Sequence, residues 1–305
     1  METSASSDNP LVILNPAANR GAMAHYREAV RSRVEREQAE YVETTKRGEA
    51  RDLARRAADE GRPVVIVGGD GSIHEVINGI LDGGRRVPLG IVAAGSGNDY
   101  AWNTLKLPHD PMAAIERAFT GQLVDVDAGI VNGEYFANSL SVGLDANIAV
   151  AAERLRTLPF MSGSRLYYSA TLQQLLFGYH HCPWLAMRVD NEQSAGEQQA
   201  RRYVVLAVTI GPTYGAGFRI NPTADYSDGL FDLCTIRYMP LLRALKLLPI
   251  VQKGEHTNLS EATFYRAKSV FIEARQPIYM QMDGEIGRAS SFDVRILPGA
   301  LQVRV

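Results

Sequence analysis

The stretch VVIVGGDGSIHEVINGI, Val64 to Ile80, decides the fold of the first half of the chain. Its β-branched run predicts a buried strand, and the segment after the glycines has the apolar spacing of a helix. Between them stand Gly68, Gly69, Asp70 and Gly71. Glycines at such a junction let the backbone approach an anionic ligand, and the first N–H groups of a helix point outward. The stretch therefore predicts a strand, a phosphate-binding turn and a helix.

The same order of strand and helix occurs four times in the first 120 residues. The expected strands are residues 11–14, 41–43, 64–67 and 89–93, each followed by a helical pattern. Repeated β-α units imply a parallel sheet with helices on its faces. Ligands of such sheets bind in the crevice at the carboxyl ends of the strands. The loops after these four strands are therefore the candidate binding site.

The second half of the chain has a different pattern, with many short strands separated by turn residues. The segment VDVDAGIVNGEYFANSLSVG predicts a hairpin around Asn132 and Gly133. Two interruptions, residues 147–178 and 240–253, have helical patterns. We therefore predict an N-terminal α/β domain at residues 1–125 and a C-terminal β-sandwich domain at residues 126–305. The final LQVRV is expected to be the last strand of the second domain.

Composition narrows the classes of function. The 305 residues are 46% apolar and 22% charged, with a formal net charge of -2, which is typical of a globular protein without a basic field for nucleic acid. The two cysteines, Cys182 and Cys234, have no metal-ligand spacing and suit a reducing compartment. METSASSDNP lacks a signal pattern, and no apolar run reaches the roughly 18 residues of a membrane span. We expect a cytoplasmic protein whose membrane contact is peripheral.

Asp70 is the unusual residue of the first glycine loop. No Gly-Lys-Ser/Thr follows, so the loop is not a Walker A motif, and it lacks the G-x-G-x-x-G spacing. A carboxylate beside phosphates repels them unless a divalent cation stands between, and Mg²⁺ binds through one or two carboxylates plus substrate phosphates. The alternative interpretation is structural, with Asp70 as the N-cap of the following helix.

Three further loops share this edge of the predicted sheet. IVAAGSGNDYAW places Gly95, Ser96, Gly97, Asn98 and Asp99 after the fourth strand. Polar residues follow the first two strands as well, namely Asn15, Asn19, Gly21, Thr44 and Thr45. Each of the latter two loops alone is explained by ordinary turn and capping chemistry. Together, four loops converge on one crevice.

The ordered set NPAANRG, TTKRGEA, GGDGSIHEVINGI and GSGNDYA resembles the nucleotide-binding domain of the diacylglycerol kinase catalytic-domain family, which includes sphingosine and ceramide kinases. GGDG alone also occurs in NAD kinases and phosphofructokinases, but GGDG followed by GSGND is specific. ANSLSVGLDANIA, NPTADYSDGLFDL and MDGEIG resemble later segments of the same family. The resemblance thus extends over nearly the whole chain.

This resemblance implies an ATP-dependent lipid kinase with an α/β domain, a β-sandwich domain and a Mg²⁺ requirement. The residues implied to bind ATP are Asn15, Thr45, Gly69, Asp70, Gly71, Ser72, Gly95, Ser96, Gly97 and Asn98. Asp70 is implied to hold the metal and Glu285 to join its water network. Asp283 is the implied general base for the acceptor hydroxyl, which suits a reaction that depends on positioning and charge. Without the family, Asp283 and Gly284 predict only a hairpin turn.

The chain departs from the family at three places. Ser72 stands where Thr is frequent and keeps the hydroxyl, whereas Trp102 stands where the family commonly has Arg. Ser227 and Asp228 replace a pair of adjacent acids, which weakens a second, structural cation site at Asp225, Asp228 and the Leu230 carbonyl. The first change is expected to be harmless. The second puts any charged contact at this position in doubt.

Our reading is transfer of the ATP γ-phosphoryl group to a lipid hydroxyl, with diacylglycerol giving phosphatidate. Sphingoid bases, ceramide, monoacylglycerol and NAD remain alternative acceptors, and a non-catalytic ATP-binding regulator is the rival class. The segments LPFMSGSRLYYSATLQQLLFGYHH and PLLRALKLLPIVQKG mix apolar and basic residues as interfacial helices do, although helices packed on the β domain have the same composition. The expected partners are a lipid substrate at a membrane surface and a second copy of the chain in a homodimer.

Overall fold

The computed structural model describes residues 9–18, 23–155, 163–190, 200–215 and 217–305. Its contacts divide the chain into two compact units. Unit 1 comprises Met1–Ala128 together with Pro298–Val305, and unit 2 comprises Gly129–Leu297. The divisions fall inside the long strands β5 (Leu123–Val131) and β13 (Glu285–Arg304). The fold class predicted from the sequence, an α/β unit followed by a β-rich unit, is confirmed.

Unit 1 is built on a parallel sheet. In spatial order its strands are β2 (Glu40–Glu43), β1 (Leu11–Leu14), β3 (Val64–Gly68), β4 (Pro88–Ala93) and the end of β13. The side chains of β1 and β3 are buried throughout, because both faces of these central strands are covered. Parallel pairing brings the carboxyl ends of β1, β3 and β4 to one edge of the sheet.

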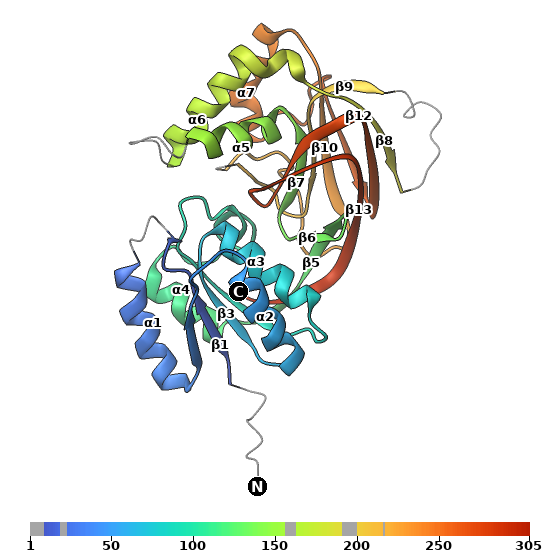
Figure 1. Cartoon of the computed structure of the whole chain (residues 1–305). Helices are drawn as coiled ribbons and strands as arrows, with labels where there is room; N and C mark the ends of the chain where they lie inside the picture. The colour runs from blue at the N-terminus through green and yellow to red at the C-terminus, as the bar shows by residue number, and fades with distance from the viewer. Residues whose placement is uncertain (1–8, 19–22, 156–162, 191–199, 216) are drawn as a thin grey trace. The chain divides into compact units, whose positions relative to one another are not determined.

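The helices of unit 1 cover both faces of this sheet (Figure 1). They are α1 (Ala24–Glu37), α2 (Glu49–Glu60), α3 (Asp70–Asp82), the π-helical turn η2 (Tyr100–Thr104) and α4 (Pro111–Thr120). Val12, Val65 and Val92 pack with side chains of α1 and α4 in one core cluster. On the other face α2 and α3 lie against each other, since Gly79 leaves room for the backbone of Arg51.

The last strand of the chain corrects one expectation. LQVRV was predicted to end the second domain, yet Gln302 and Val303 pair in parallel with Pro88 and Leu89 of β4. The outer edge of β4 carries N–H and C=O groups that need a partner, and the side chain of Val303 is buried in this position. The end of β13 therefore completes the sheet of unit 1.

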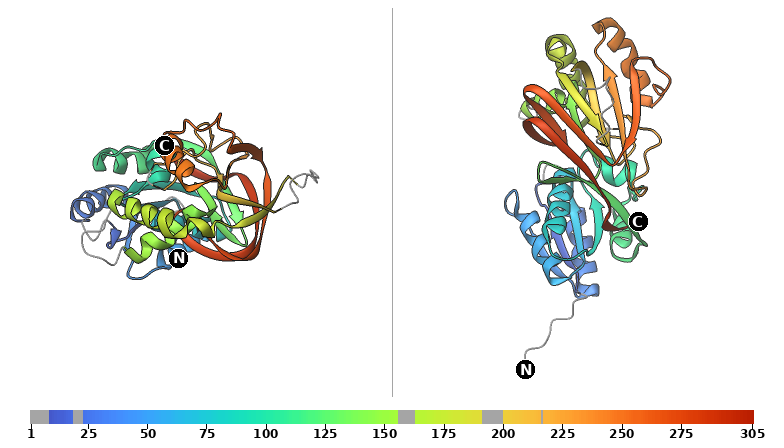
Figure 2. Two further views of the ribbon diagram at one scale, coloured as in Figure 1. Left: turned by 90° about the horizontal axis from the view of Figure 1, so that it is seen from above. Right: turned by 90° about the vertical axis from the view of Figure 1, so that its right-hand side faces the viewer.

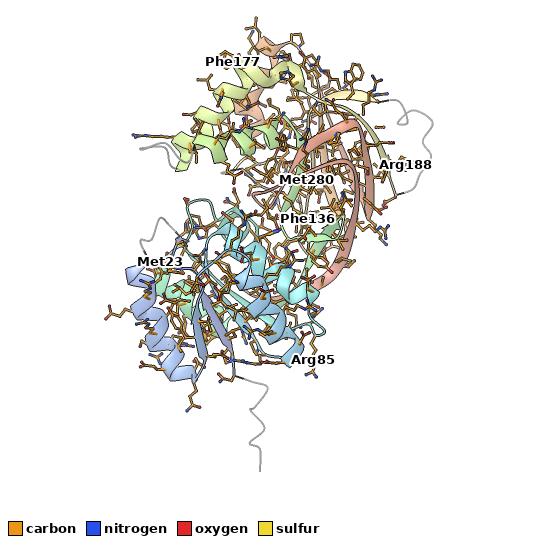
Figure 3. The ribbon with its side chains drawn as sticks, in the orientation of Figure 1. Met23, Arg85, Phe136, Phe177, Arg188 and Met280 are labelled. Carbon is orange, nitrogen blue, oxygen red and sulfur yellow. The ribbon has the colours of Figure 1, made fainter. Side chains whose placement is uncertain are left out.

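Unit 2 is a β-rich unit with antiparallel pairing. Besides parts of β5 and β13 it contains β6 (Glu134–Phe136), β7 (Ser139–Gly143), β8 (Trp184–Val189), β9 (Arg201–Thr209), β10 (Phe231–Arg237), β11 (Ala262–Ala267) and β12 (Ser269–Met282). Both β7 and β8 pair with β9 and with β12, so these four strands close into a ring. Phe136 and Met280, labelled in Figure 3, belong to the apolar core of these strands.

Helices gather on one side of the strands of unit 2 (Figures 1 and 2). They are α5 (Leu144–Leu155), α6 (Gly163–Gln173), the π-helical turn η3 (Gln174–Gly178), the 3-10 turn η4 (Tyr179–His181) and α7 (Leu241–Lys253). Leu175, Tyr179 and Leu247 pack with residues of β9 and β10 in a second core cluster. Helical structure was predicted from the sequence for residues 147–178 and 240–253, which overlap these helices. Among the described helices none is long and apolar enough to span a membrane.

Candidate functional site

The glycine loops after β3 and β4 lie in direct contact. A Cβ atom on Gly95 would lie 2.6 Å from the Cα atom of Gly69, and the N–H of Ala94 donates to the carbonyl of Gly68 at 2.8 Å. Such an approach is closed to any residue with a side chain. From the sequence, we predicted that these glycines let a phosphate approach the backbone. Their backbones also have to pass each other.

Asp70 joins these two loops. Its Oδ2 atom accepts the backbone N–H of Asn98 at 2.7 Å. Asn98 is buried and has a φ of 57°, a left-handed conformation that Asn tolerates better than most residues. Its amide closes the loop, because Oδ1 accepts the N–H of Gly95 at 3.0 Å and Nδ2 donates to the Gly95 carbonyl at 2.8 Å. The alternative role of Asp70 as N-cap is wrong, since Gly69 is the cap of α3 and no side chain completes it.

The loop after β1 contacts the start of α3. The Nδ2 atom of Asn15 donates to the hydroxyl of Ser72 at 2.7 Å, and Asn15 Oδ1 accepts the N–H of Ala17 at 2.9 Å. Ser72 is buried, so its hydroxyl is fixed by this bond. Asn19 and Gly21 lie outside the described residues. Asn15 is therefore the residue of the loop after β1 that contacts the start of α3, next to the glycine turn.

The loop after β2 is held by two glutamates that the sequence reading did not single out. Glu49 accepts both the N–H and the hydroxyl of Thr45, at 2.6 and 2.9 Å. These hydrogen bonds, the backbone one foremost, hold the pKa of Glu49 below its usual value. Glu75 of α3 accepts the N–H of Gly48 at 2.9 Å. Thr45 and Glu49 are four residues apart, one more than the spacing of a capping box, so no standard local pattern indicated this contact.

The edge formed by these loops suits an anionic ligand with a cation. Because α3 begins at Asp70, the amide groups of its first turn lie at the ends of β3 and β4, where the helix dipole favours negative charge. Ser96 and Gly97 are exposed, and a Cβ on Gly97 would lie 2.7 Å from Asp70 Oδ2. One carboxylate beside amide and hydroxyl groups fits Mg²⁺, which completes its shell with waters and phosphate oxygens.

The residues just after the second glycine loop are engaged in local structure. Asp99 accepts the side-chain amide of Asn103 at 2.7 Å, which supports the turn η2. The ring of Trp102 stacks on His109 with the ring centres 4.3 Å apart. Trp102, which stands where the family commonly has Arg, thus makes an aromatic contact.

In unit 2, Asp283 and Gly284 form a hairpin turn between β12 and β13. Their φ values are 48° and 92°, the conformation of a two-residue turn with both residues left-handed. The carboxylate accepts three backbone N–H groups: Oδ2 that of Ala137 at 2.7 Å, and Oδ1 those of Asn138 and Ser139 at 3.0 and 2.8 Å. The hairpin interpretation is confirmed, and the side chain is held in one orientation by the segment before β7.

The segment before β7 connects several loops of unit 2. The Nδ2 atom of Asn138 donates to the Thr213 carbonyl at 2.8 Å, and its backbone carbonyl accepts the N–H groups of Ile210 and Gly211. Asn138 is buried, and Asp283 is partly exposed. Glu285 lies opposite Met282 at the first pair of the hairpin and is also partly exposed. The two predicted carboxylates of this motif are therefore neighbours on one turn.

The predicted second cation site contains an internal ion pair. Asp228 accepts the N–H of Leu230 and pairs with the guanidinium of Arg266, while Asp225 accepts the N–H and hydroxyl of Ser227. Within the described part of the chain, no three His, Cys, Asp or Glu side chains gather as a metal-binding group. At this turn Arg266 supplies the positive charge that a cation would bring, so these residues do not fit a cation in the arrangement described.

Two buried carboxyl groups were not singled out from the sequence. Asp145 at the start of α5 accepts the hydroxyl of Tyr214 at 2.8 Å, and burial raises its pKa. Burial also raises the pKa of Asp232 to about 6, against the opposing effect of Arg266. Oδ2 of Asp232 has no hydrogen-bond partner among the described residues. Both lie in segments that resemble the family, ANSLSVGLDANIA and NPTADYSDGLFDL, but the burial of their carboxyl groups depends on packing and has no local sequence signal.

With this geometry in view, the chain belongs to the diacylglycerol kinase catalytic domain family. The model of the diacylglycerol kinase catalytic domain matches residues 9–131, and that of the YegS C-terminal NAD kinase beta sandwich-like domain matches residues 138–305. The resemblance stated from the sequence is thereby confirmed.

Named relatives cover most of the chain. It is 28% identical over 302 residues to a diacylglycerol kinase of Mycobacterium tuberculosis, covering 95% of this chain and 93% of the relative. It is 30% identical over 250 residues to a diacylglycerol kinase of Staphylococcus saprophyticus, covering 80% and 77%. A crystal structure of a diacylglycerol kinase from Bacillus anthracis has the same fold, with a TM-score of 0.72, 18% identity and coverage of 97% and 96%.

Proposed function

We propose that the protein transfers the γ-phosphoryl group of ATP to the hydroxyl of a membrane lipid, with diacylglycerol as acceptor and phosphatidate as product. Membership of the diacylglycerol kinase catalytic domain family supports a kinase that uses ATP. The observation that carries the proposal is the hydrogen bond from Asn98 to Asp70, because it unites the two glycine loops at the carboxyl ends of β3 and β4. Phosphoryl transfer depends mainly on positioning and charge, and these loops offer both.

The ATP phosphates would be bound by the two glycine loops and the residues beside them. We assign this role to Gly69, Asp70, Gly71, Ser72, Gly95, Ser96, Gly97 and Asn98, with Asn15 and Thr45 next to them. Asn15 would orient the Ser72 hydroxyl, and Glu49 would orient that of Thr45. Asp70 would hold Mg²⁺, which neutralises charge on the phosphates when bound.

Asp283 is the proposed general base for the acceptor hydroxyl. A base must present a fixed oxygen to the proton that it removes, and the N–H groups of Ala137, Asn138 and Ser139 fix this carboxylate. In the proposed step the proton leaves the lipid hydroxyl for Asp283 as the hydroxyl oxygen bonds to the γ-phosphorus, and ADP takes the electrons of the broken P–O bond. We propose that this occurs at the cytoplasmic face of a membrane.

Transfer of labelled γ-phosphate from ATP tests the reaction and the acceptor together. The purified chain would be offered diacylglycerol, monoacylglycerol, ceramide, sphingosine and NAD in mixed micelles, with Mg²⁺ or with a chelator. The expected product is labelled phosphatidate, formed only with Mg²⁺. If another acceptor became labelled, it would replace diacylglycerol as the proposed substrate. Undiminished transfer in the presence of the chelator would contradict the proposed Mg²⁺ requirement. ATP binding without any labelled product would favour a regulatory protein.

A further inference from the structure

The helical layer of unit 2 has an apolar face that its own packing does not use. In α6 and η3, Leu166, Ala170 and Leu175 are buried against the rest of the unit. The opposite face of the same segment is apolar as well. It exposes Tyr168, Leu172, Leu176 and Phe177, with Phe177 labelled in Figure 3.

Helix α7, in the same helical layer, also exposes apolar side chains. Leu242 and Leu245 are exposed three residues apart, while Leu247 of the same helix is buried. The two segments are joined directly, because Nε2 of Gln252 donates to the hydroxyl of Tyr168 at 3.1 Å. We call the six exposed side chains, Tyr168, Leu172, Leu176, Phe177, Leu242 and Leu245, the helical apolar surface.

This concentration is unusual for the chain. Nine large apolar side chains are exposed among the described residues, and six of them belong to the helical apolar surface. Leu242 and Phe177 are the most exposed of all, at 75% and 71%. Single exposed apolar residues need no explanation, but a group of them marks an interaction surface.

The charges of these helices are of one sign. Residues 163–181 and 241–253 contain no Asp or Glu, and they carry Arg165, Arg243, Lys246 and Lys253. Of these, Arg243 pairs with Glu261 at 2.8 Å. Exposed Arg165 and Lys246 thus stand among the apolar side chains without a neighbouring acid on their own segment. An apolar face with basic residues around it complements the anionic surface of a membrane.

We propose that the helical apolar surface docks the protein on an anionic membrane. The proposal rests on the proposed function in one respect, since a lipid kinase has to reach an acceptor in a bilayer. A second copy of the chain suits the surface less well. A symmetric dimer through this face would bring Arg165, Lys246 and Lys253 near their own copies.

Vesicle sedimentation without nucleotide tests the surface independently of catalysis. The full chain would be mixed with vesicles of phosphatidylglycerol and phosphatidylcholine, and bound and free protein separated. Phe177→Ala and Leu242→Ala should each weaken binding about tenfold, since each removes a large apolar side chain from the contact. Lys246→Glu should weaken it at least about fivefold, and added salt should weaken binding of the wild type.

Matched controls come from unit 1. Met112 of α4 is 62% exposed and Arg56 of α2 is exposed, so Met112→Ala and Arg56→Glu change the same chemistry elsewhere. Both should leave vesicle binding unchanged. Equal losses in the control and surface variants would overturn the proposal, as would unaltered binding in Phe177→Ala. Conversion of a dimer to a monomer by Phe177→Ala without lipid would assign the surface to a second copy instead.

Turnover on a short-chain, water-soluble diacylglycerol separates this proposal from the proposed function. Phe177→Ala should keep wild-type turnover on that substrate while losing activity on vesicles. Loss of both activities together, in a folded variant, would overturn a docking role. A wild type that binds vesicles through this surface but phosphorylates no lipid would contradict the proposed function and leave the docking surface in place.

Discussion

The dipeptide Asp-Gly occurs at both candidate sites, and the two copies do different work. Asp70 and Gly71 begin a helix, and the Asp70 carboxylate reaches one backbone amide of the adjacent loop through Oδ2. Asp283 and Gly284 make a hairpin turn, and the Asp283 carboxylate uses both of its oxygens to hold three amides. The first joins two ligand loops, whereas the second organises the backbone around it.

The difference matters for reading variants of the two residues. An Asn side chain at position 70 can still accept the N–H of Asn98, because Asn keeps one acceptor oxygen. Asn cannot replace a carboxylate that uses both oxygens, because its NH₂ group then faces a donor. Loss of activity at Asp70 and at Asp283 would therefore have different physical origins.

The largest effect is expected for Asp70→Asn. Loss of the negative charge should lower kcat by at least about 100-fold through poorer metal and phosphate positioning. The free energy of unfolding should change by less than about 1 kcal/mol, because Asn can still accept the N–H of Asn98. Lipid phosphorylation and thermal denaturation measure the two quantities. Asp52→Asn on the exposed face of α2 is the control, and near-normal turnover of Asp70→Asn would rule out the metal role.

Asp283→Asn should reduce both turnover and stability. At least one of the three backbone N–H groups loses its acceptor, which should lower the free energy of unfolding by about 2 kcal/mol. Lost base function should lower kcat with little change in ATP affinity. Both are measured at a temperature at which the variant is folded.

Asp190 provides a matched control for this change. It also has a positive φ, of 47°, and accepts the N–H groups of Lys268 and Ser269. Both bonds use the single atom Oδ1, so Asp190→Asn should cost less than about 1 kcal/mol. Equal stability losses at Asp190 and Asp283 would refute the two-oxygen argument. Unaltered kcat in folded Asp283→Asn would remove it as the base.

Two glycine substitutions separate close approach from backbone conformation. Gly95→Ala places a Cβ 2.6 Å from Gly69 Cα and should cost about 2 kcal/mol with weaker ATP binding, since the glycine loops must move apart. Gly284→Ala has open space but a φ of 92°, so it should cost about 1 kcal/mol and leave ATP binding unchanged. Denaturant titration and ATP titration distinguish them. Intact ATP binding in Gly95→Ala would show that the loop contact is dispensable.

The smallest effect concerns the buried carboxyl group of Asp232, whose Oδ2 atom has no hydrogen-bond partner among the described residues. Because its folded pKa is raised to about 6 from the usual 3.8, the folded state holds a proton that the unfolded state releases. Stability should therefore fall as pH rises from about 4 to about 6 and stay lower above it. Asp232→Asn should remove this slope and raise stability at pH 7 by about 1 kcal/mol. Denaturation at several pH values tests this, and an unchanged slope in the variant would contradict it.

The convergence of the loops could be predicted from the sequence, because parallel strands end at the same edge of a sheet. The order of strands and glycines in the sequence was enough to predict that Asn15, Ser72, Asp70 and Asn98 lie near one another. The bond between Asp70 and Asn98 could not be predicted, since it requires the positive φ of Asn98. Nor could the contact of Gly69 with Gly95, which depends on which strands are neighbours.

Long-range pairing limited the prediction in unit 2. The hairpin at Asp283 is a local signal, carried by the dipeptide and the alternating residues around it. The amides that its carboxylate binds come from residues 137–139, far away in sequence, and no local pattern indicates them. The same limit explains the wrong assignment of LQVRV. Its alternation identifies a strand but not the partner of that strand.

The pairing of β13 with β4 has a consequence for the order of events during synthesis. Pro88 and Leu89 emerge from the ribosome long before Gln302 and Val303, so the edge of β4 waits for about 200 further residues to be translated. Nascent unit 1 therefore stays incomplete while all of unit 2 is made. A premature stop that removes only the last few residues should therefore destabilise unit 1, which is synthesised first. Unit 2, which directly precedes the missing residues in the sequence, should be unaffected.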